Sequence, residues 1–306
     1  MTGFIDARAT ERQLPDAATP GIADARLLPD DQFSSAWSAI VLPADMKGRL
    51  LRTAVAGIHL RAAVPFDALP LHGVILLTGR PGVGKTTVAR GLADKVADTV
   101  TGAAEWLFLE IDPHALASSS LGRSQRSVEQ LFGTVLDEHA AAGPTIILID
   151  EVETMFTDRN ALSMDSNPID VHRAVDAALV GLDRLARRHP DVLVIATSNF
   201  PRAIDAALDS RADSIFEVPL PDRDARRAIL EHTAAALAAA FPGGAELLEP
   251  RVLDRAADLA DGLDGRQLRK VVAAACALRP KSKGDPDQVT GADLIAAITE
   301  IRRGRG

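Results

Sequence analysis

The chain has 306 residues, of which 47% are hydrophobic, and it carries a formal net charge of −8. This acidic balance lacks the basic face on which non-specific binding to nucleic acid depends, so DNA and RNA are disfavoured partners. No uncharged apolar stretch reaches the roughly 18 residues of a membrane span, and the first residues do not resemble a secretory signal. We therefore expect a globular cytoplasmic protein without membrane association. Its single cysteine, Cys276, fits a reducing compartment.

The first part of the chain has little periodic pattern. Residues 1–34 contain three prolines among charged residues, which predicts a loosely ordered N-terminal segment. From there to about residue 65, apolar residues recur at the three- and four-residue spacing of helices.

Short apolar runs then alternate with amphipathic segments as far as Pro221. Strands are expected at 73–78, 105–111, 145–150, 192–197 and 214–218, with helices at 85–98, 124–141 and 168–188. This alternation predicts an α/β domain over residues 35–221, in which a parallel five-stranded sheet is flanked by helices. Beyond Pro221 no strand pattern remains, and helical patterns over residues 222–306 predict a C-terminal all-helical lid domain.

A glycine-rich sequence follows the first of these strands. Gly79-Arg-Pro-Gly-Val-Gly-Lys-Thr86 fits the pattern G-x-x-x-x-G-K-[ST]. The glycines let several backbone N–H groups face one anion, and the helix that follows adds the positive end of its dipole. The pattern predicts a bound nucleoside triphosphate, with Lys85 on the β- and γ-phosphates and the Thr86 hydroxyl on magnesium. The expected phosphate-binding residues are Gly79, Pro81, Gly82, Val83, Gly84, Lys85, Thr86 and Thr87.

Two acidic residues, Asp150 and Glu151, follow the predicted strand that begins at Thr145. A continuous apolar run is typical of a parallel strand buried on both faces, and ligands bind at the carboxyl ends of such strands. We expect Asp150 to hold magnesium together with Thr86, and Glu151 to polarise an attacking water. This pairing predicts hydrolysis, whereas a solvated Asp-Glu turn is the simpler alternative.

Together with three later features, these motifs resemble the AAA+ ATPases. A strand ends at Asn199, Arg211 precedes the last predicted strand, and Arg266 lies near the start of a helical pattern in the lid. The resemblance implies ATP and Mg²⁺ as bound groups and a ring of subunits, expected to be a hexamer. It also implies that Asn199 is the first sensor, that Arg211 reaches the γ-phosphate of a neighbouring subunit, and that Arg266 is the second sensor. Each arginine could instead form an ordinary surface ion pair, for Arg211 with Asp209 or Asp213.

One branch of that family, the pachytene-checkpoint ATPases with their short bacterial relatives, is similar over about residues 35–306. The stretches that carry this resemblance are 69–77, 109–116, 149–153, 173–178 and 204–213. Members of this branch remodel HORMA-domain proteins. The resemblance therefore implies ATP-driven pulling on, or partial unfolding of, a HORMA-domain partner, within a bacterial antiphage system if the chain is bacterial.

A serine-rich sequence lies where the family presents a central-pore loop with aromatic residues. The expected pore-loop residues are Ser119, Ser120, Leu121 and Arg123. Leu121 is the single bulky apolar residue among them, so a polar turn is the alternative. A second stretch, residues 158–167, would line the same channel or form an exposed connector.

Two other functions remain open from the sequence. An AAA+ loader that acts on nucleic acid would need a positive channel and would bind DNA with a steep dependence on salt. A nucleotide-gated scaffold would hydrolyse ATP slowly and exchange partners as its state changes. The set of Glu151, Asn199 and Arg211 argues against the scaffold, because a switch needs less catalytic equipment.

Overall fold

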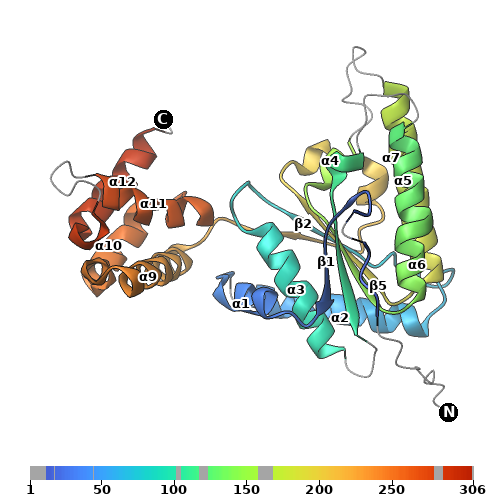
Figure 1. Ribbon diagram of the computed structural model, residues 1–306, viewed down its shortest axis with the longest axis horizontal. Coiled ribbons are helices and arrows are strands. Elements are labelled where there is room, and N and C mark those ends of the chain that lie inside the picture. The colour runs from blue at the N-terminus through green and yellow to red at the C-terminus, as the bar shows by residue number, and fades with distance from the viewer. Residues whose placement is uncertain are drawn as a thin grey trace. The chain divides into compact units, whose positions relative to one another are not determined.

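The chain forms two compact units, shown in Figure 1. The structure, a computed structural model, describes residues 12–16, 18–43, 45–100, 105–116, 123–157, 168–278 and 285–304. The α/β unit comprises Met1–Ser38, Gly48–Gly79 and Lys85–Glu217, and the helical unit comprises Ala39–Lys47, Arg80–Gly84 and Val218–Gly306. None of the described helices is both long enough and apolar enough to cross a membrane.

A sheet in the order β1-β3-β4-β5-β2-β6 forms the centre of the α/β unit (Figure 1). Its strands are β1 (Ile22–Leu28), β2 (Val74–Thr78), β3 (Trp106–Ile111), β4 (Thr145–Ile149), β5 (Val192–Ser198) and β6 (Ser214–Glu217). Five of them, β2 to β6, run parallel to one another, which confirms the predicted parallel arrangement of these strands. Every residue of β2, β3, β4 and β5 is buried, as expected for apolar strands covered on both faces.

The sixth strand, β1, is a correction to the sequence analysis. The chain was expected to be loosely ordered over residues 1–34 and the sheet to have five strands, but Ile22–Leu28 pairs antiparallel with the whole of β3. Only Leu28 of this strand is buried, so the segment lacks the alternation of apolar residues by which a strand is recognised. Its place is set by backbone pairing with a buried neighbour, which a pattern of side chains does not report.

Arg12 attaches the chain ahead of β1 to one end of the sheet. Its guanidinium donates hydrogen bonds to the backbone carbonyls of Glu105, His139, Gly143 and Pro144 and to the hydroxyl of Thr145. Burial lowers the pKa of Arg12 to about 10. These oxygens lie at the N-terminal ends of β3 and β4, which is the end of the sheet opposite to Asp150.

Helices cover both faces of the sheet (Figure 1). One face is covered by α5 (Arg123–Gln130), the π-helical turn η1 (Leu131–Val135), α6 (Leu136–Ala141) and α7 (Pro168–Arg188). The other is covered by α1 (Asp31–Ala39), α2 (Met46–Ala63) and α3 (Lys85–Thr99). The shorter helices are α4 (Pro113–Leu116), η2 (Val152–Thr154), η4 (Pro201–Ala203) and α8 (Ala206–Asp209). The helix predicted at 124–141 is thus present, with a π-helical turn inside it.

The core of the α/β unit has two layers because successive side chains of a strand point to opposite faces. Leu107 and Leu109 of β3 pack in the layer with α5, η1 and α7. Phe108, between them, meets the ring of Phe33 from α1 edge to face, with centroids 4.9 Å apart. Fully burying one such side chain stabilises the fold by about 1.5–3 kcal/mol.

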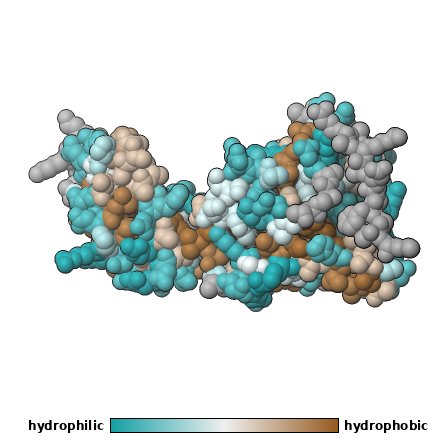
Figure 2. Space-filling view, turned by 90° about the horizontal axis from the view of Figure 1, so that it is seen from below, coloured by the Kyte–Doolittle hydropathy of each residue, from teal (hydrophilic) through white to brown (hydrophobic). Residues whose placement is uncertain are grey.

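The surface near α2 carries apolar side chains among polar ones, and Figure 2 views the molecule from the side on which α2 lies in Figure 1. Leu60 of α2 and Ile215 of β6 are 44% and 51% exposed. A cavity of about 260 Å³ lies between α2 and the starts of β2, β5 and β6. The buried Arg61 lines it, and its guanidinium donates to the carbonyls of Ala186, His189 and Val192.

The helical unit has a core of its own, in which Leu230, Leu253 and Leu268 are buried. Its elements are α9 (Arg223–Ala240), η5 (Pro242–Leu248), α10 (Pro250–Leu259), α11 (Gly265–Ala277), η7 (Pro286–Gln288) and α12 (Gly291–Arg303). Side chains cap three of its helices: Asp222 for α9, Asp264 for α11 and Thr290 for α12. Each such cap stabilises a helix by about 1 kcal/mol, which explains where these helices begin.

Candidate nucleotide-binding site

The glycine-rich loop joins β2 to α3 and has the backbone that its sequence requires. Gly79, Gly82 and Gly84 have φ angles of 144°, 84° and 101°, which residues with a side chain rarely adopt. A Cβ at Gly82 would lie 2.5 Å from an oxygen of Asp264, and one at Gly84 would lie 2.9 Å from Ile40. Glycine is therefore needed at both positions, and the loop fits the predicted phosphate cradle.

Lys85 begins α3 directly after the loop and is buried. Its Nζ donates to the carbonyl oxygen of Gly79 at 2.8 Å and to Oδ1 of Asn199 at 2.7 Å. The second bond brings the predicted phosphate-binding lysine into contact with the predicted first sensor, which lies 114 residues later.

Asp150 lies at the carboxyl end of β4 between two hydroxyl groups. Thr86 Oγ1 lies 3.0 Å from both carboxylate oxygens. Thr197 of β5 donates its hydroxyl to Oδ1 of Asp150 and accepts from the N–H of Glu151 at 3.2 Å. The register explains this contact, because Ile149 pairs with Ala196 and the next residue of each strand therefore lies alongside. Carboxylate and hydroxyl oxygens are ligands that Mg²⁺ prefers, so Asp150 and Thr86 fit the predicted metal site.

Glu151 has an unusual backbone and an exposed side chain. Its φ of 49° and ψ of 53° lie in the left-handed region, which costs a residue with a side chain on the order of 1 kcal/mol or more. Asn199 donates from Nδ2 to Oε1 of Glu151 at 3.0 Å. The Asn199 amide thus bridges the predicted base and Lys85, so the structure brings all three predicted residues together.

Two residues of this network, Thr197 and Glu153, were not assigned a role by the sequence analysis. Oε1 of Glu153 accepts from the backbone N–H of Asn199 at 3.0 Å and so holds the sensor loop. Glu153 ends the stretch 149–153, which carries part of the family resemblance, and Thr197 ends the predicted strand 192–197. The hydrogen-bond partners of Thr197 and Glu153 depend on which residues of neighbouring segments lie side by side in the fold.

A second carboxylate lies near Asp150, at the carboxyl end of β3. Glu110 forms hydrogen bonds with Arg90 of α3 at 2.8–3.0 Å. Burial raises the pKa of Glu110, and although Arg90 opposes this shift, the negative charge of Asp150 adds to it. The site therefore has one carboxylate neutralised by an arginine and another, Asp150, held by hydroxyl groups.

Arg211 follows α8 and forms an ion pair, but with neither of the predicted partners Asp209 and Asp213. It pairs with Asp183 of α7, with Nε 2.6 Å from Oδ1 and Nη2 2.8 Å from Oδ2. Its Nη1 donates to the carbonyl of Ala207 at 2.7 Å. Asp213 instead accepts hydrogen bonds from backbone N–H groups at the start of β2. The described hydrogen bonds of Arg211 reach none of the other predicted site residues.

Arg266 is the second residue of α11, and its side chain is exposed. Within the helical unit its backbone N–H donates to the carbonyl of Gly82 at 3.2 Å. Over the described residues its guanidinium forms no ion pair, so the ion-pair alternative is not realised there.

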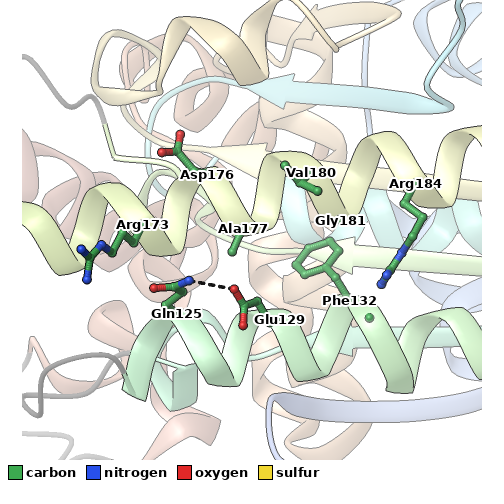
Figure 3. A pocket seen from close by; sticks show the side chains of 10 residues that line it. Gln125, Glu129, Phe132, Arg173, Asp176, Ala177, Val180, Gly181 and Arg184 are labelled. Atoms are coloured by element: carbon green, nitrogen blue, oxygen red, sulfur yellow. Dashed lines mark hydrogen bonds between the residues drawn. The ribbon is translucent and has the colours of Figure 1, made fainter.

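The predicted pore-loop residues Ser119, Ser120 and Leu121 lie outside the described residues, as does the stretch 158–167. Arg123 is the first residue of α5. A cavity of about 340 Å³ lies between α5, η1 and α7, as Figure 3 shows. Phe132 and Val180 line it, and Gln125 donates to Glu129 across one turn of α5 at 2.8 Å. None of its lining residues belongs to the nucleotide site.

Comparison with known proteins identifies the family. Residues 75–220 match the family described as "ATPase family associated with various cellular activities (AAA)". CD-NTase-associated protein 6 from Pseudomonas aeruginosa is 46% identical over 297 residues, which cover 97% of this chain and 97% of that protein. The chain belongs to the AAA ATPase family. Nucleotide binding follows from this membership, in agreement with the glycine loop.

Two further similarities place this AAA ATPase near the pachytene-checkpoint proteins. The putative pachytene checkpoint protein 2 of Caenorhabditis elegans is 34% identical over 215 residues, which cover 69% of this chain and 50% of that protein. The structure of C. elegans PCH-2 matches with a TM-score of 0.71 at 27% identity, over 92% of this chain and 75% of that one. These similarities confirm the predicted α/β fold with a helical C-terminal region.

A third similarity concerns the fold alone. A chain in the structure of the E. coli MS115-1 HORMA:CdnC:Trip13 complex matches with a TM-score of 0.74 at 17% identity. The match covers 92% of this AAA ATPase and 95% of that chain, so the helical unit is included in the likeness.

Proposed function

We propose that this AAA ATPase hydrolyses ATP with Mg²⁺ in a ring of subunits, expected to be a hexamer, and that hydrolysis remodels a HORMA-domain protein. The proposed setting is the regulation of antiphage signalling in the bacterial cytoplasm. The observation that carries this proposal is the 46% identity with CD-NTase-associated protein 6 over nearly the full length of both chains. The likeness to pachytene checkpoint protein 2 supports it, because both similarities lead to the same branch as the sequence motifs.

The residues of the loop have separate tasks in this proposal. Backbone N–H groups between Gly79 and Thr86, together with Lys85, hold the phosphates, and Thr86 and Asp150 hold Mg²⁺. The ion, when bound, neutralises negative charge on the phosphate oxygens. Thr197 keeps the Asp150 carboxylate in its orientation through the hydrogen bond between them.

Glu151 and Asn199 act on the attacking water. The Glu151 carboxylate orients the water and accepts its proton, and the Asn199 amide contacts that carboxylate at 3.0 Å. Arg211 supplies positive charge to the γ-phosphate bound by a neighbouring subunit, where negative charge develops during transfer. Activity then depends on assembly, because one subunit binds the nucleotide and the next provides the arginine.

The Glu151→Gln variant tests this function. We expect its turnover to fall by about 10²- to 10⁴-fold, the usual contribution of a general base, while ATP affinity is retained. A HORMA-domain protein from the same genomic neighbourhood should stay bound to this variant when ATP is present. The matched control is Glu129→Gln on α5, which removes an exposed carboxylate whose hydrogen-bond partner among the described residues is Gln125.

Two results would contradict the proposal. Wild-type turnover in the Glu151→Gln variant would show that this carboxylate is not the base. Stimulation of turnover by DNA, with binding that weakens steeply as salt increases, would favour a loader that acts on nucleic acid instead.

A further inference from the structure

Arg211 is held by a carboxylate that belongs to none of the predicted site motifs. Asp183 accepts from Nε and Nη2 of Arg211, and Ala207 accepts from Nη1. A guanidinium has five N–H donors, and these three contacts use three of them. Among the described residues, one N–H on Nη1 and one on Nη2 have no acceptor, and these two nitrogens lie at the outer end of the side chain.

The carboxylate is itself fixed in place from two directions. Asp183 lies in α7 between Leu182 and Leu185, whose side chains are buried in the core beneath the sheet. On its other side, Nε2 of His72 lies 3.2 Å from Oδ1 of Asp183. The His72 ring packs edge to face on Phe66, with centroids 5.1 Å apart. Arg211 therefore meets a carboxylate that is held by a helix and by the segment before β2.

Hydrogen bonding from Arg211 lowers the pKa of Asp183, so this carboxylate is charged at neutral pH. The ion pair is partly open to water, since the side chains of Arg211 and Asp183 are 21% and 35% exposed. Ion pairs that are open to this degree contribute little to stability. The bidentate geometry instead restricts where the guanidinium points, because both Nε and Nη2 are fixed.

We propose that Asp183 is a positioning residue for Arg211, which orients the two remaining N–H groups toward the phosphate of a nucleotide bound by a neighbouring subunit. The inference rests on the proposed function, in which Arg211 acts on that neighbour. A long side chain loses rotamer freedom when it engages a ligand, and an arginine already held in one orientation loses less. Loss of this restraint on the Arg211 side chain is expected to lower turnover about two- to tenfold.

Three variants test the positioning role through kinetics. In Asp183→Ala we expect kcat to fall about two- to tenfold, with unchanged ATP affinity. Among the described residues, the hydrogen-bond and ion-pair partners of Asp183 are Arg211 and His72, which do not belong to its own subunit's nucleotide site. Asp183→Asn keeps one oxygen acceptor and should have an intermediate kcat. The matched control is Asp67→Ala, which removes an exposed carboxylate 2.8 Å from Arg187 of the same helix and should leave kcat unchanged.

A double variant and mixed assemblies separate positioning from general damage. If Asp183 acts through Arg211, Asp183→Ala combined with Arg211→Ala should have the same kcat as Arg211→Ala alone. In mixed assemblies, Glu151→Gln subunits still donate Arg211 and should restore turnover at sites of Arg211→Ala subunits. Adding Asp183→Ala to the Glu151→Gln subunit should reduce that restored turnover.

The outcomes distinguish the proposed role of Arg211 from the proposed positioning role of Asp183. Unchanged turnover in Arg211→Ala would overturn the proposed role of Arg211 itself. If Arg211→Ala loses turnover but Asp183→Ala and Asp183→Asn keep or exceed the wild-type kcat, only the positioning role is wrong. ATP affinity that falls in step with kcat, or additive losses in the double variant, would also overturn it. Circular dichroism of each variant identifies one that fails to fold, and Asp183→Asn, which keeps the shape of the side chain, then decides.

Discussion

Thr197 provides the sharpest test of the network around Asp150, because a nearly isosteric substitution removes its hydroxyl. The side chain is 1% exposed, donates to Oδ1 of Asp150 and accepts from the N–H of Glu151. Thr197→Val keeps the shape but replaces the hydroxyl with a methyl group. Thr197→Ser keeps the hydroxyl and loses a methyl group, so the two variants separate hydrogen bonding from packing.

The contacts of Thr197 determine how much stability each variant should lose. A hydrogen bond to a charged group is worth about 1.5–3 kcal/mol, and a buried N–H left without an acceptor costs about 1–3 kcal/mol. Asp150 is only partly buried, so water replaces some of the first contribution. We therefore expect Thr197→Val to lower the free energy of unfolding by about 2–4 kcal/mol. Thr197→Ser, which loses one buried methyl group, should lower it by about 1 kcal/mol.

Urea unfolding of both variants at pH 7 measures this difference directly. Packing alone predicts the reverse order, since valine fills the space better than serine. A valine variant at least as stable as the serine variant would therefore refute the reasoning. In addition, the magnesium-dependent ATP affinity of Thr197→Val should fall about 10- to 100-fold, as is common when a residue that orients a metal ligand is replaced. Titration with a fluorescent nucleotide measures it.

Other predictions concern glycines and the single thiol. Gly82→Ala should abolish ATP binding in a nucleotide titration, because φ is 84° and an oxygen of Asp264 lies 2.5 Å from the new Cβ. The control Gly262→Ala has a similar φ of 81° but open space around the new Cβ. It should lose about 1 kcal/mol of stability and keep its ATP affinity. Gly57→Ala should raise the free energy of unfolding by about 0.5–1 kcal/mol, since the new Cβ would meet no neighbouring atom within 4 Å. Gly181→Ala should lower it by about 1–3 kcal/mol, because the new Cβ would lie 2.5 Å from a carbon of the core residue Phe132. Urea unfolding measures both changes. Burial raises the pKa of Cys276 above 9.0, so the pH profile of iodoacetamide alkylation should lie at higher pH for the folded protein than in urea. By linkage, stability from this thiol is present below pH 9.0 and is lost as pH rises through the folded pKa.

The inner parallel strands β2 to β5 could be predicted because each is largely apolar, which is typical of strands that are buried on both faces. β1 could not, because Asp24 and Arg26 interrupt its pattern and its pairing uses backbone atoms. The π-helical turn η1 has no signal in the apolar spacing, since helical spacing continues through it. The presence of an additional strand at the edge of the sheet, and of a π-helical turn within a helix, therefore depends on tertiary contacts.

Some residues of the candidate site could be predicted from the sequence, whereas the contacts of others could not. Motif spacing predicted Lys85, Thr86, Asp150 and Glu151, because residue types suited to phosphate and metal-ion binding occupy fixed positions within each motif. The contacts of Thr197 with Asp150 depend on the register between β4 and β5, and spacing along the chain does not specify a register. In the same way, the pairing of Arg211 with a residue of α7 depends on how two helices pack.

β1 also influences how the sheet meets other polypeptides. Asp24 and Arg26 form an ion pair at 2.7 Å, and the register shifts between Ile22 and Asp24. Charged side chains and an irregular edge discourage strand addition by a foreign chain. Without this strand, the apolar and fully buried β3 would become the margin of the sheet and present unpaired backbone groups as a template for intermolecular β-structure. β1 thereby shields this margin of the sheet from pairing with other chains.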